Sequence, residues 1–565
     1  MSFQNLLTTK VGTITPVLCE ELMPNETVNL SAAIQAQLPP LASDTFMRCD
    51  LKYEAFFVPH RLVMRGFEEW LVPNSTMNYA DLSGSLDNYK PRVPLVELNA
   101  DEVQPGTLAD YLGVKSNMPV ASAITSADSA SYMISSSSTI SVNALPFLAY
   151  HRIYDDWYRN TLVQMPIYHG EGVVSNLSYD TVYSAANSKF MVPDVNRGFK
   201  LTHNSSHLSG TPGGKHYADE VSVTALRQRN FGYDRFTSAT PDAQNGDAQG
   251  LKMTVSNNTA SFSIGQLRAA NAIQQWLERN NLAGNKLVDY VKANYGANLS
   301  EGVAQRAILL GSGKFAVYSK GIYQTAQNPY SDADDFVNNT ANPLAYSPAA
   351  QFGSAFASGA EKIIDGFTAQ EPGYLFVMCT LVPRQTYSTG IDRKLIRYSQ
   401  NELTDMANPM LQGTGNEPIW ITELDTDNAF RMLGVKGDQQ VFAYQERYAD
   451  WKSKEDEVHG LLRDHNYTWS AAGNQFPSLS SFALQSSFGI GDGLQFGSDF
   501  LQIPVDYLDQ VAAVHGDISK YGCWIDSYFD FKVSMPLARY SLPSLQDPAY
   551  EHGEDVVLDR GGKRL

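Results

Sequence analysis

Some side chains in this sequence have types and spacings that could support catalysis or ligand binding. One candidate is the glycine- and lysine-containing stretch Leu310-Gly311-Ser312-Gly313-Lys314-Phe315. A phosphate-binding loop needs a glycine five positions before its second glycine, and a Ser or Thr directly after its lysine. Ile308 and Phe315 occupy these two positions, so both requirements fail. The stretch is better interpreted as a glycine turn between two elements.

Histidine and carboxylate clusters are the other candidates for chemistry. His459 and His465 have acidic neighbours, but their spacing matches no known metal-ligand pattern and favours a solvated charged turn. Adjacent carboxylates could flank a glycosidic bond, yet such pairs are ordinary on protein surfaces. They occur here as Glu20-Glu21, Glu68-Glu69 and Asp155-Asp156. The sequence therefore predicts neither an enzyme nor a cofactor or metal site.

The C-terminal segment is locally basic. Arg560, Lys563 and Arg564 lie there beside two glycines. Each cation could replace a counterion on a nucleic-acid backbone. The alternative is a solvated, frayed terminus. These three residues are the candidate nucleic-acid contacts.

The elements that would carry such residues are mainly strands. From Met47 to Val58, apolar and charged residues alternate, which predicts a half-buried strand that ends at Pro59. The run from Tyr374 to Val382 is apolar on both faces, which predicts a central strand. Further candidates are 28–34 and 525–533, with shorter ones at 14–18, 253–255, 419–422 and 441–444.

Helices are few and loops are long. The spacing of apolar residues predicts helices over 143–159, from Leu267 onward, and over 287–295, where Gly296 is a natural stop. Stretches rich in small and polar residues predict loops at 121–143, 203–214, 237–250 and 331–356. Loops longer than about 15 residues usually have their own structure or function. We therefore expect residues 170–252 to form a projecting subdomain.

Composition limits the classes of protein that the chain could be. The net charge is −18 and only 18% of the residues are charged. The surface must therefore carry many neutral polar and aromatic groups, which are cheaper to desolvate in protein contacts. Four cysteines without close spacing are expected to be free thiols, mostly buried. We also expect no signal peptide, no membrane span and folding in a cytoplasm.

The order of the predicted strands indicates the fold class. Strands near both ends of the chain must share one sheet, although very long intervals separate them. Greek-key and jelly-roll architectures pair distant strands in this way and place insertions in the connecting loops. The sequence therefore predicts a mainly β protein, an antiparallel β-sandwich with long loop insertions and a few short helices.

Several segments, in the same order, resemble the major capsid proteins of the Microviridae, particularly the gokushovirus group. Residues 53–63 (YEAFFVPHRLV) are similar to the family's FFVP-x-RLV stretch, and residues 150–160 to its aromatic helix. Residues 442–449 (FAYQERYA) are similar to its YQERYA block. Residues 16–27 and 267–280 also match family segments. Together these matches span most of the chain.

The resemblance implies an eight-stranded viral jelly roll that forms a single domain over residues 1–565. It also implies three insertions: loops at 75–142, a large surface insertion at 170–252 as the candidate threefold spike, and a helical and loop insertion at 256–372. The expected function is self-assembly into a T=1 icosahedral capsid of about 60 copies around circular single-stranded DNA.

The expected partners and location follow from the same resemblance. They are other copies of the chain, the single-stranded DNA genome, a small basic DNA-binding protein, other virion proteins and a host receptor contacted by the outer loops. The expected location is the virion, assembled in the cytoplasm of the host bacterium. Two alternatives stay open: a jelly-roll carbohydrate-binding or polysaccharide-acting protein, and a trimeric phage spike or fibre.

Overall fold

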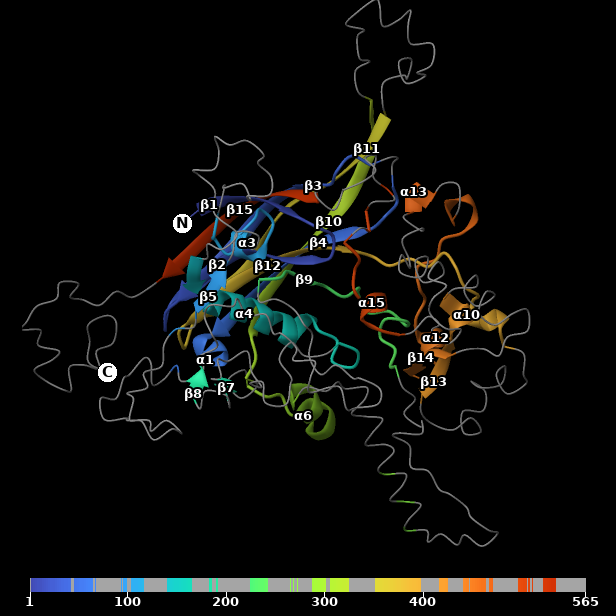
Figure 1. Ribbon diagram of the computed structural model, residues 1–565. Helices are drawn as coiled ribbons and strands as arrows, with labels where there is room; N and C mark the ends of the chain where they lie inside the picture. Colours follow the sequence, from blue (N-terminus) through green and yellow to red (C-terminus); the bar gives the residue numbers. More distant parts are fainter. Residues whose placement is uncertain are drawn as a thin grey trace, which may run out of the picture.

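The computed structural model shows a protein built mainly of β-strands (Figure 1). The residues that the structure describes are 2–41, 45–64, 67, 93, 95–98, 103–115, 140–164, 182–184, 189–191, 224–241, 265, 268, 272, 287–300, 305–324, 351–397, 416–424, 441–446, 448–463, 467–470, 496–505, 507–508, 511 and 522–534.

Nine strands form one antiparallel sheet that curls back on itself (Figure 1). Their order is β1-β15-β3-β11-β10-β4-β12-β2-β9. The eight long strands are β1 (Ser2–Thr9), β2 (Thr13–Leu22), β3 (Thr27–Gln37), β4 (Cys49–Pro59), β10 (Ile308–Gln324), β11 (Gln351–Thr368), β12 (Gly373–Pro383) and β15 (Cys523–Ser534); β9 (Arg227–Gln228) is a short edge strand.

The eight long strands have jelly-roll connectivity. The first half of the sheet is β1-β15-β3-β11, and the second half is β10-β4-β12-β2. Along the chain, every connection between these strands crosses from one half to the other, except the one from β4 to β10. The pairing is strongly non-local, since Ser2 of β1 lies opposite Asp530 of β15. The predicted eight-stranded jelly roll is confirmed.

The main core lies between the two halves. Leu30 of β3 and Phe529 of β15 pack there with Leu51 and Tyr53 of β4. The Tyr53 hydroxyl makes a buried hydrogen bond of 2.7 Å with the hydroxyl of Ser527 on β15. Each half therefore contributes its apolar face, and the one polar pair between these two strands is satisfied inside the core.

A second core covers the other face of the second half. Phe56 of β4 and Phe376 of β12 pack with Leu148 of helix α4 (Leu145–Ile153). Every residue of β12 is buried, as expected for a strand covered on both faces. In the first half, β15 instead alternates between buried and exposed residues. Only one half of the roll therefore has both faces covered by described residues.

Most strand predictions are confirmed, with shifted ends. The four main candidates are the cores of β3, β4, β12 and β15, and Pro59 is the last residue of β4. Residues 14–18 belong to the longer strand β2, and 441–444 to β14 (Val441–Glu446). The prediction for 419–422 is half wrong, because β13 (Asn416–Trp420) ends there and α10 (Ile421–Leu424) begins. Residues 253–255 lie outside the described residues.

Two central strands contradict the expectations for their segments. The stretch 310–315 is not a turn between elements but lies inside β10, where Gly313 pairs with Tyr53 of β4. The predicted loop 331–356 overlaps the start of β11. Both strands fall within the interval 256–372, expected as a helical and loop insertion. Their glycine, serine and alanine residues have weak β propensity, and pairing with neighbouring strands overrides it.

The helices agree better with the sequence. The region 143–159 contains α4, followed by a turn of π-helix, Tyr154–Tyr158. Helix α6 (Leu287–Tyr295) is confirmed, and Gly296 follows it with a φ of 65°. The helix expected from Leu267 falls largely outside the described residues. Other short helices are α1 (His60–Val63), α3 (Leu108–Tyr111), α12 (Ala449–Lys452), α13 (Tyr467–Ser470) and α15 (Ser498–Leu501), with 3-10 turns at Arg393–Leu395 and Gly460–Arg463.

The long connections from β4 to β10 and from β12 to β15 carry three small sheets. These are β5 (Leu95–Leu98) with β6 (Ile140–Asn143), β7 (Val182–Ser184) with β8 (Lys189–Met191), and β13 with β14. The β13-β14 pair belongs to a third apolar cluster that includes Phe442, Phe496 and Phe500. The expected insertions 75–142 and 170–252 lie largely outside the described residues and stay predictions.

Gly359 of β11 allows the two halves of the roll to approach each other. A Cβ atom on Gly359 would lie 2.7 Å from the ring of Phe315 on β10. We expect Gly359→Ala to lower the free energy of unfolding by about 1–3 kcal/mol, because the buried ring must move. In an uncrowded strand position the same change would stabilise slightly. Urea unfolding of the unassembled chain measures the effect.

Ala360→Val is the matched control for this test. Ala360 is the next residue of the same strand and is exposed. We expect its stability to stay within about 0.5 kcal/mol of the wild type. Equal unfolding midpoints for Gly359→Ala and the wild type would contradict the proposed close approach.

Candidate functional site

The phosphate-loop fragment cannot cradle a phosphate. Its residues form backbone pairs with β4, for example Lys314 with Lys52, so no turn before a helix is present. The Lys314 ammonium lies 2.8 Å from the carboxylate of Asp50 on the same sheet. Phosphate binding of this kind needs backbone N–H groups that converge at a loop and a helix N-terminus. The rejection of an NTP-binding motif therefore agrees with the geometry.

The other sequence candidates have structural partners. His459 is exposed and lies 3.1 Å from Glu457. Asp155 and Asp156 form ion pairs one helical turn away, with Arg159 and Arg152. Among the described residues, no three His, Cys, Asp or Glu side chains are arranged to hold a metal ion. His465, Glu68, Glu69 and the basic residues Arg560, Lys563 and Arg564 lie outside the described residues.

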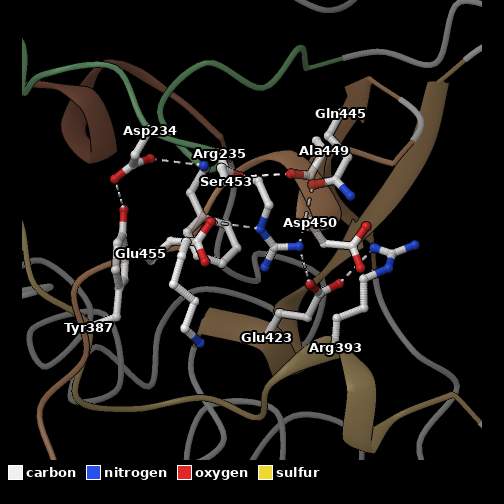
Figure 2. Close-up of polar contacts among 12 residues, drawn as sticks. Asp234, Arg235, Tyr387, Arg393, Glu423, Gln445, Ala449, Asp450, Ser453 and Glu455 are labelled. Atoms are coloured by element: carbon white, nitrogen blue, oxygen red, sulfur yellow. Dashed lines mark hydrogen bonds and ion pairs between the residues drawn. The ribbon is translucent and has the colours of Figure 1, made fainter.

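The most developed polar site joins the two long insertions to each other. Arg235 comes from the connection between β4 and β10, whereas Glu423 and Glu455 come from the connection between β12 and β15. The Arg235 guanidinium donates to Glu423 at 2.9 Å and to Glu455 at 3.0 Å (Figure 2). The side chains of Arg235 and Glu423 are 5% and 0% exposed. This is a buried ion pair between segments 188 residues apart.

A second arginine shares the same carboxylate. Arg393 donates to the other oxygen of Glu423 at 3.1 Å, and the backbone N–H of Trp420 donates to that oxygen at 3.0 Å. The Gln445 amide lies 3.4 Å from Arg235 and donates to Glu417 at 2.6 Å. The buried carboxylate therefore has a donor on each oxygen, which is what a desolvated charge requires.

The charges in this network keep Arg235 protonated. Burial lowers the pKa of Arg235, but the carboxylates of Glu423 and Glu455 outweigh burial and leave the pKa above its usual value. Nearby, the Tyr387 hydroxyl donates to Asp234 at 2.6 Å (Figure 2). Burial, reinforced by that carboxylate, raises the pKa of Tyr387 well above its ordinary range. The geometry of the network fits a structural joint between the two connections.

A second joint ties the connection between β4 and β10 to the roll itself. The Arg229 guanidinium donates to both oxygens of Glu54 on β4, at 2.5 and 3.0 Å. The Tyr158 hydroxyl donates to the same carboxylate at 2.5 Å. Burial raises the pKa of Glu54, but the hydrogen bonds from Arg229 and Tyr158 outweigh it and leave the pKa below its usual value.

A third joint fixes the start of β10. The Asp156 carboxylate accepts from the backbone N–H of Ala307 at 2.9 Å, and the Trp157 indole donates to the carbonyl of Ala307 at 2.8 Å. Asp156 and Trp157 belong to the π-helical turn, a feature that often marks functional positions. The turn therefore sets where the chain re-enters the sheet.

Composition and spacing did not identify these joints as sites. All three nevertheless contain residues from segments singled out by the family resemblance, since Glu54 of the second joint lies in 53–63. Residues 150–160 contribute the π-helical turn, and 442–449 contribute Gln445. Arg235 and Glu423 carried no local signal, because their meaning depends on a partner far away in the sequence. The signal that could have located the joints was the family resemblance, whose segments are rich in charged and aromatic residues.

Removal of the buried carboxylate should destabilise the joint between the insertions. We expect Glu423→Gln to cost about 3–5 kcal/mol, because Arg235 and Arg393 lose the buried negative charge that both contact. Hydrogen exchange of residues 416–424 and 441–446 reports the local effect. Glu446→Gln is the control, since Glu446 pairs with Lys452 at the surface. Equal protection in the two variants would rule out the assigned role.

Glu54 should make stability depend on pH. Its pKa is lower in the folded chain than its ordinary value of 4.5. Its contribution is therefore complete above pH 4.5 and is lost as the pH falls through the lower folded pKa. We expect Glu54→Gln to be less stable at pH 7 and to lose less stability below pH 4.5. Urea midpoints at several pH values measure this, and parallel profiles would contradict the assignment.

Comparisons with known proteins agree on one family. The family described as "Capsid protein (F protein)" matches residues 1–545. The chain is 23% identical over 579 residues to "Capsid protein VP1" of Bdellovibrio phage phiMH2K, covering 96% of this chain and 94% of that protein. The corresponding values are 22%, 94% and 93% for "Capsid protein VP1" of Chlamydia phage 1, and 22%, 95% and 93% for that of Spiroplasma virus 4.

The match and the fold lead to the same conclusion. None of the described helices has the length and apolar character needed to cross a bilayer. The described residues form a jelly roll with two long connections, and a buried ion pair joins described parts of these connections. The chain belongs to the capsid protein (F protein) family of phages.

Proposed function

We propose that this chain is the major coat protein of a small single-stranded-DNA phage and assembles into a T=1 icosahedral shell of about 60 copies around a circular genome. The observation that carries the proposal is the family match over residues 1–545 together with a jelly roll whose insertions are fixed by buried ion pairs. On this proposal the role is structural and not enzymatic.

Attachment of the insertions supports assembly. A subunit that makes several interfaces must present each surface in one position, because binding to mobile segments costs ordering entropy. The joints at Glu423, Glu54 and Ala307 remove that freedom before assembly. Each interface can then be modest, since a closed shell gives every copy several contacts at once.

The outer loops, with 170–252 as the candidate threefold spike, are proposed to contact a host receptor. The proposed internal partners are single-stranded DNA and a small basic protein, with Arg560, Lys563 and Arg564 as candidate phosphate contacts. The net charge of −18 supports a role for a separate basic protein, because a cationic partner would neutralise the phosphates that the acidic chain encloses. Assembly in the host cytoplasm and residence in the virion complete the proposal.

Salt-dependent assembly tests the proposal. Copies of a chain with net charge −18 repel one another, and salt screens this repulsion. We expect the purified 62.3 kDa chain to form closed particles of about 3.7 MDa, in a yield that rises with ionic strength. Electron microscopy and native mass measurement give the result. A monomer or trimer at all salt concentrations, especially with glycan binding or turnover, would support the rival functions instead.

A further inference from the structure

Among the described residues, the outward face of the first half of the jelly roll carries exposed aromatic rings. Along β15, Trp524 and Tyr528 point away from the main core and are 41% and 50% exposed. Leu6 of the neighbouring strand β1 is 71% exposed. By contrast, α4 covers the outward face of β4 and β12. The exposed rings therefore lie on an inner strand of a four-stranded antiparallel surface, β1-β15-β3-β11.

The neighbours of the two rings are small or carry amides. Trp524 lies between Thr8 of β1 and Gln37 of β3 in the strand register. Tyr528 lies between Gln4 and Ala33. Directly opposite side chains of this kind are about 5 Å apart at Cβ. A flat ring placed on Trp524 or Tyr528 would thus meet the amide of Gln37 or Gln4 at its edge, and none of these four neighbours is bulky.

Most charged groups on this face are paired with one another. Asp530 lies 3.0 Å from Lys532, and Asp526 accepts from the Gln4 amide at 2.8 Å. Lys362 of β11, opposite Ser31 of β3, is the second cation. Lys362 pairs in turn with Asp365, so three aspartates and two lysines give this face a net charge of −1. Phosphate groups would gain little here, so the face suits a ligand that is recognised through uncharged rings.

We propose that this face binds the unpaired bases of single-stranded nucleic acid by stacking on Trp524 and Tyr528. The inference rests on the proposed function, in which the shell encloses a single-stranded genome. Aromatic side chains on an exposed antiparallel sheet are a general way to bind splayed bases, and base stacking tolerates every sequence. The carbonyl and carboxylate oxygens of Gln37 and Asp526 can accept from exocyclic amino groups of bases.

A groove beside this face has room for a single-stranded nucleic acid. It runs between the edge strand β1 and strand β2, which lies next to the short edge strand β9, and has a volume of about 1310 Å³. Trp524, Gln35 and Gln37 line it, so it is continuous with the aromatic face. The Asn5 amide of β1 donates to the backbone carbonyl of Val17 on β2 across it, at 2.7 Å.

A second copy of the chain is the other conceivable occupant, and the charges disfavour it. Asp526 and Asp530 lie beside the rings on the same strand. A protein interface over the rings would desolvate both carboxylates against another strongly acidic copy. A nucleic acid stacked on the rings can keep its phosphates directed to solvent and leave Asp530 hydrated.

Binding of a fluorescent oligothymidine of about 30 nucleotides to the unassembled full-length chain tests the inference. We expect the double variant Trp524→Ala/Tyr528→Ala to bind at least about tenfold more weakly by fluorescence anisotropy. The single variant Trp524→Phe, which keeps Tyr528, should bind with most of the wild-type affinity, because an aromatic ring remains at position 524. The matched control is Trp451→Ala, since Trp451 is 58% exposed on a different element, α12.

Two further measurements make each outcome decisive. Ultraviolet crosslinking of the wild-type chain should attach the oligonucleotide to the peptide that contains 523–534, whether or not any variant folds. Wild-type affinity in the double variant, with crosslinks elsewhere, would overturn the inference and leave shell formation intact. Loss of particle assembly with unchanged oligonucleotide binding would assign the face to a second copy and also overturn it. Ring-dependent binding by a chain that never forms particles would uphold it while removing the proposed function.

Discussion

The structure depends on strand β15, which comes from a late part of the sequence but pairs with two strands from the beginning. β15 begins at Cys523 and lies between β1 and β3, both within the first 37 residues. Without β15, the apolar residues of β3 that face the main core lose their partner Phe529, and Tyr53 loses the hydroxyl of Ser527. The entropic cost of closing a loop rises only slowly with the length of the loop. Very large insertions are therefore tolerated between the strands.

Those insertions then need their own attachment. A small sheet such as β13-β14 is marginal by itself, and a joint to a larger body gives it a fixed position. Here the attachment is electrostatic as well as apolar: Arg235 and Glu423 meet inside a cluster that also contains Phe236 and Phe442. A buried ion pair adds little net stability compared with an apolar pair, but it penalises every arrangement in which one charge is left alone. It therefore specifies position more than it strengthens the fold.

The strands of the roll could be predicted from the sequence better than the ion pairs of the joints could. β12 was predictable because the run from Tyr374 to Val382 is apolar on both faces, and β4 because apolar and charged residues alternate. β10 and β11 were not, since Gly311, Gly313 and Gly359 resemble loop residues until the opposing strand is known. The partners of Arg235 lie 188 and 220 residues away, beyond any local pattern. Periodicity reports burial, whereas long-range ion pairs appear only in three dimensions.

The central claim is that a single roll closed by β15 is the unit from which a shell is built. Electron cryomicroscopy of particles assembled from this chain tests it most directly. We expect every subunit to show β15 between β1 and β3, with the two long insertions joined at Glu423 and identical copies in contact around the roll. Particles whose subunits divide into separate domains, or whose last strand pairs elsewhere, would contradict the account.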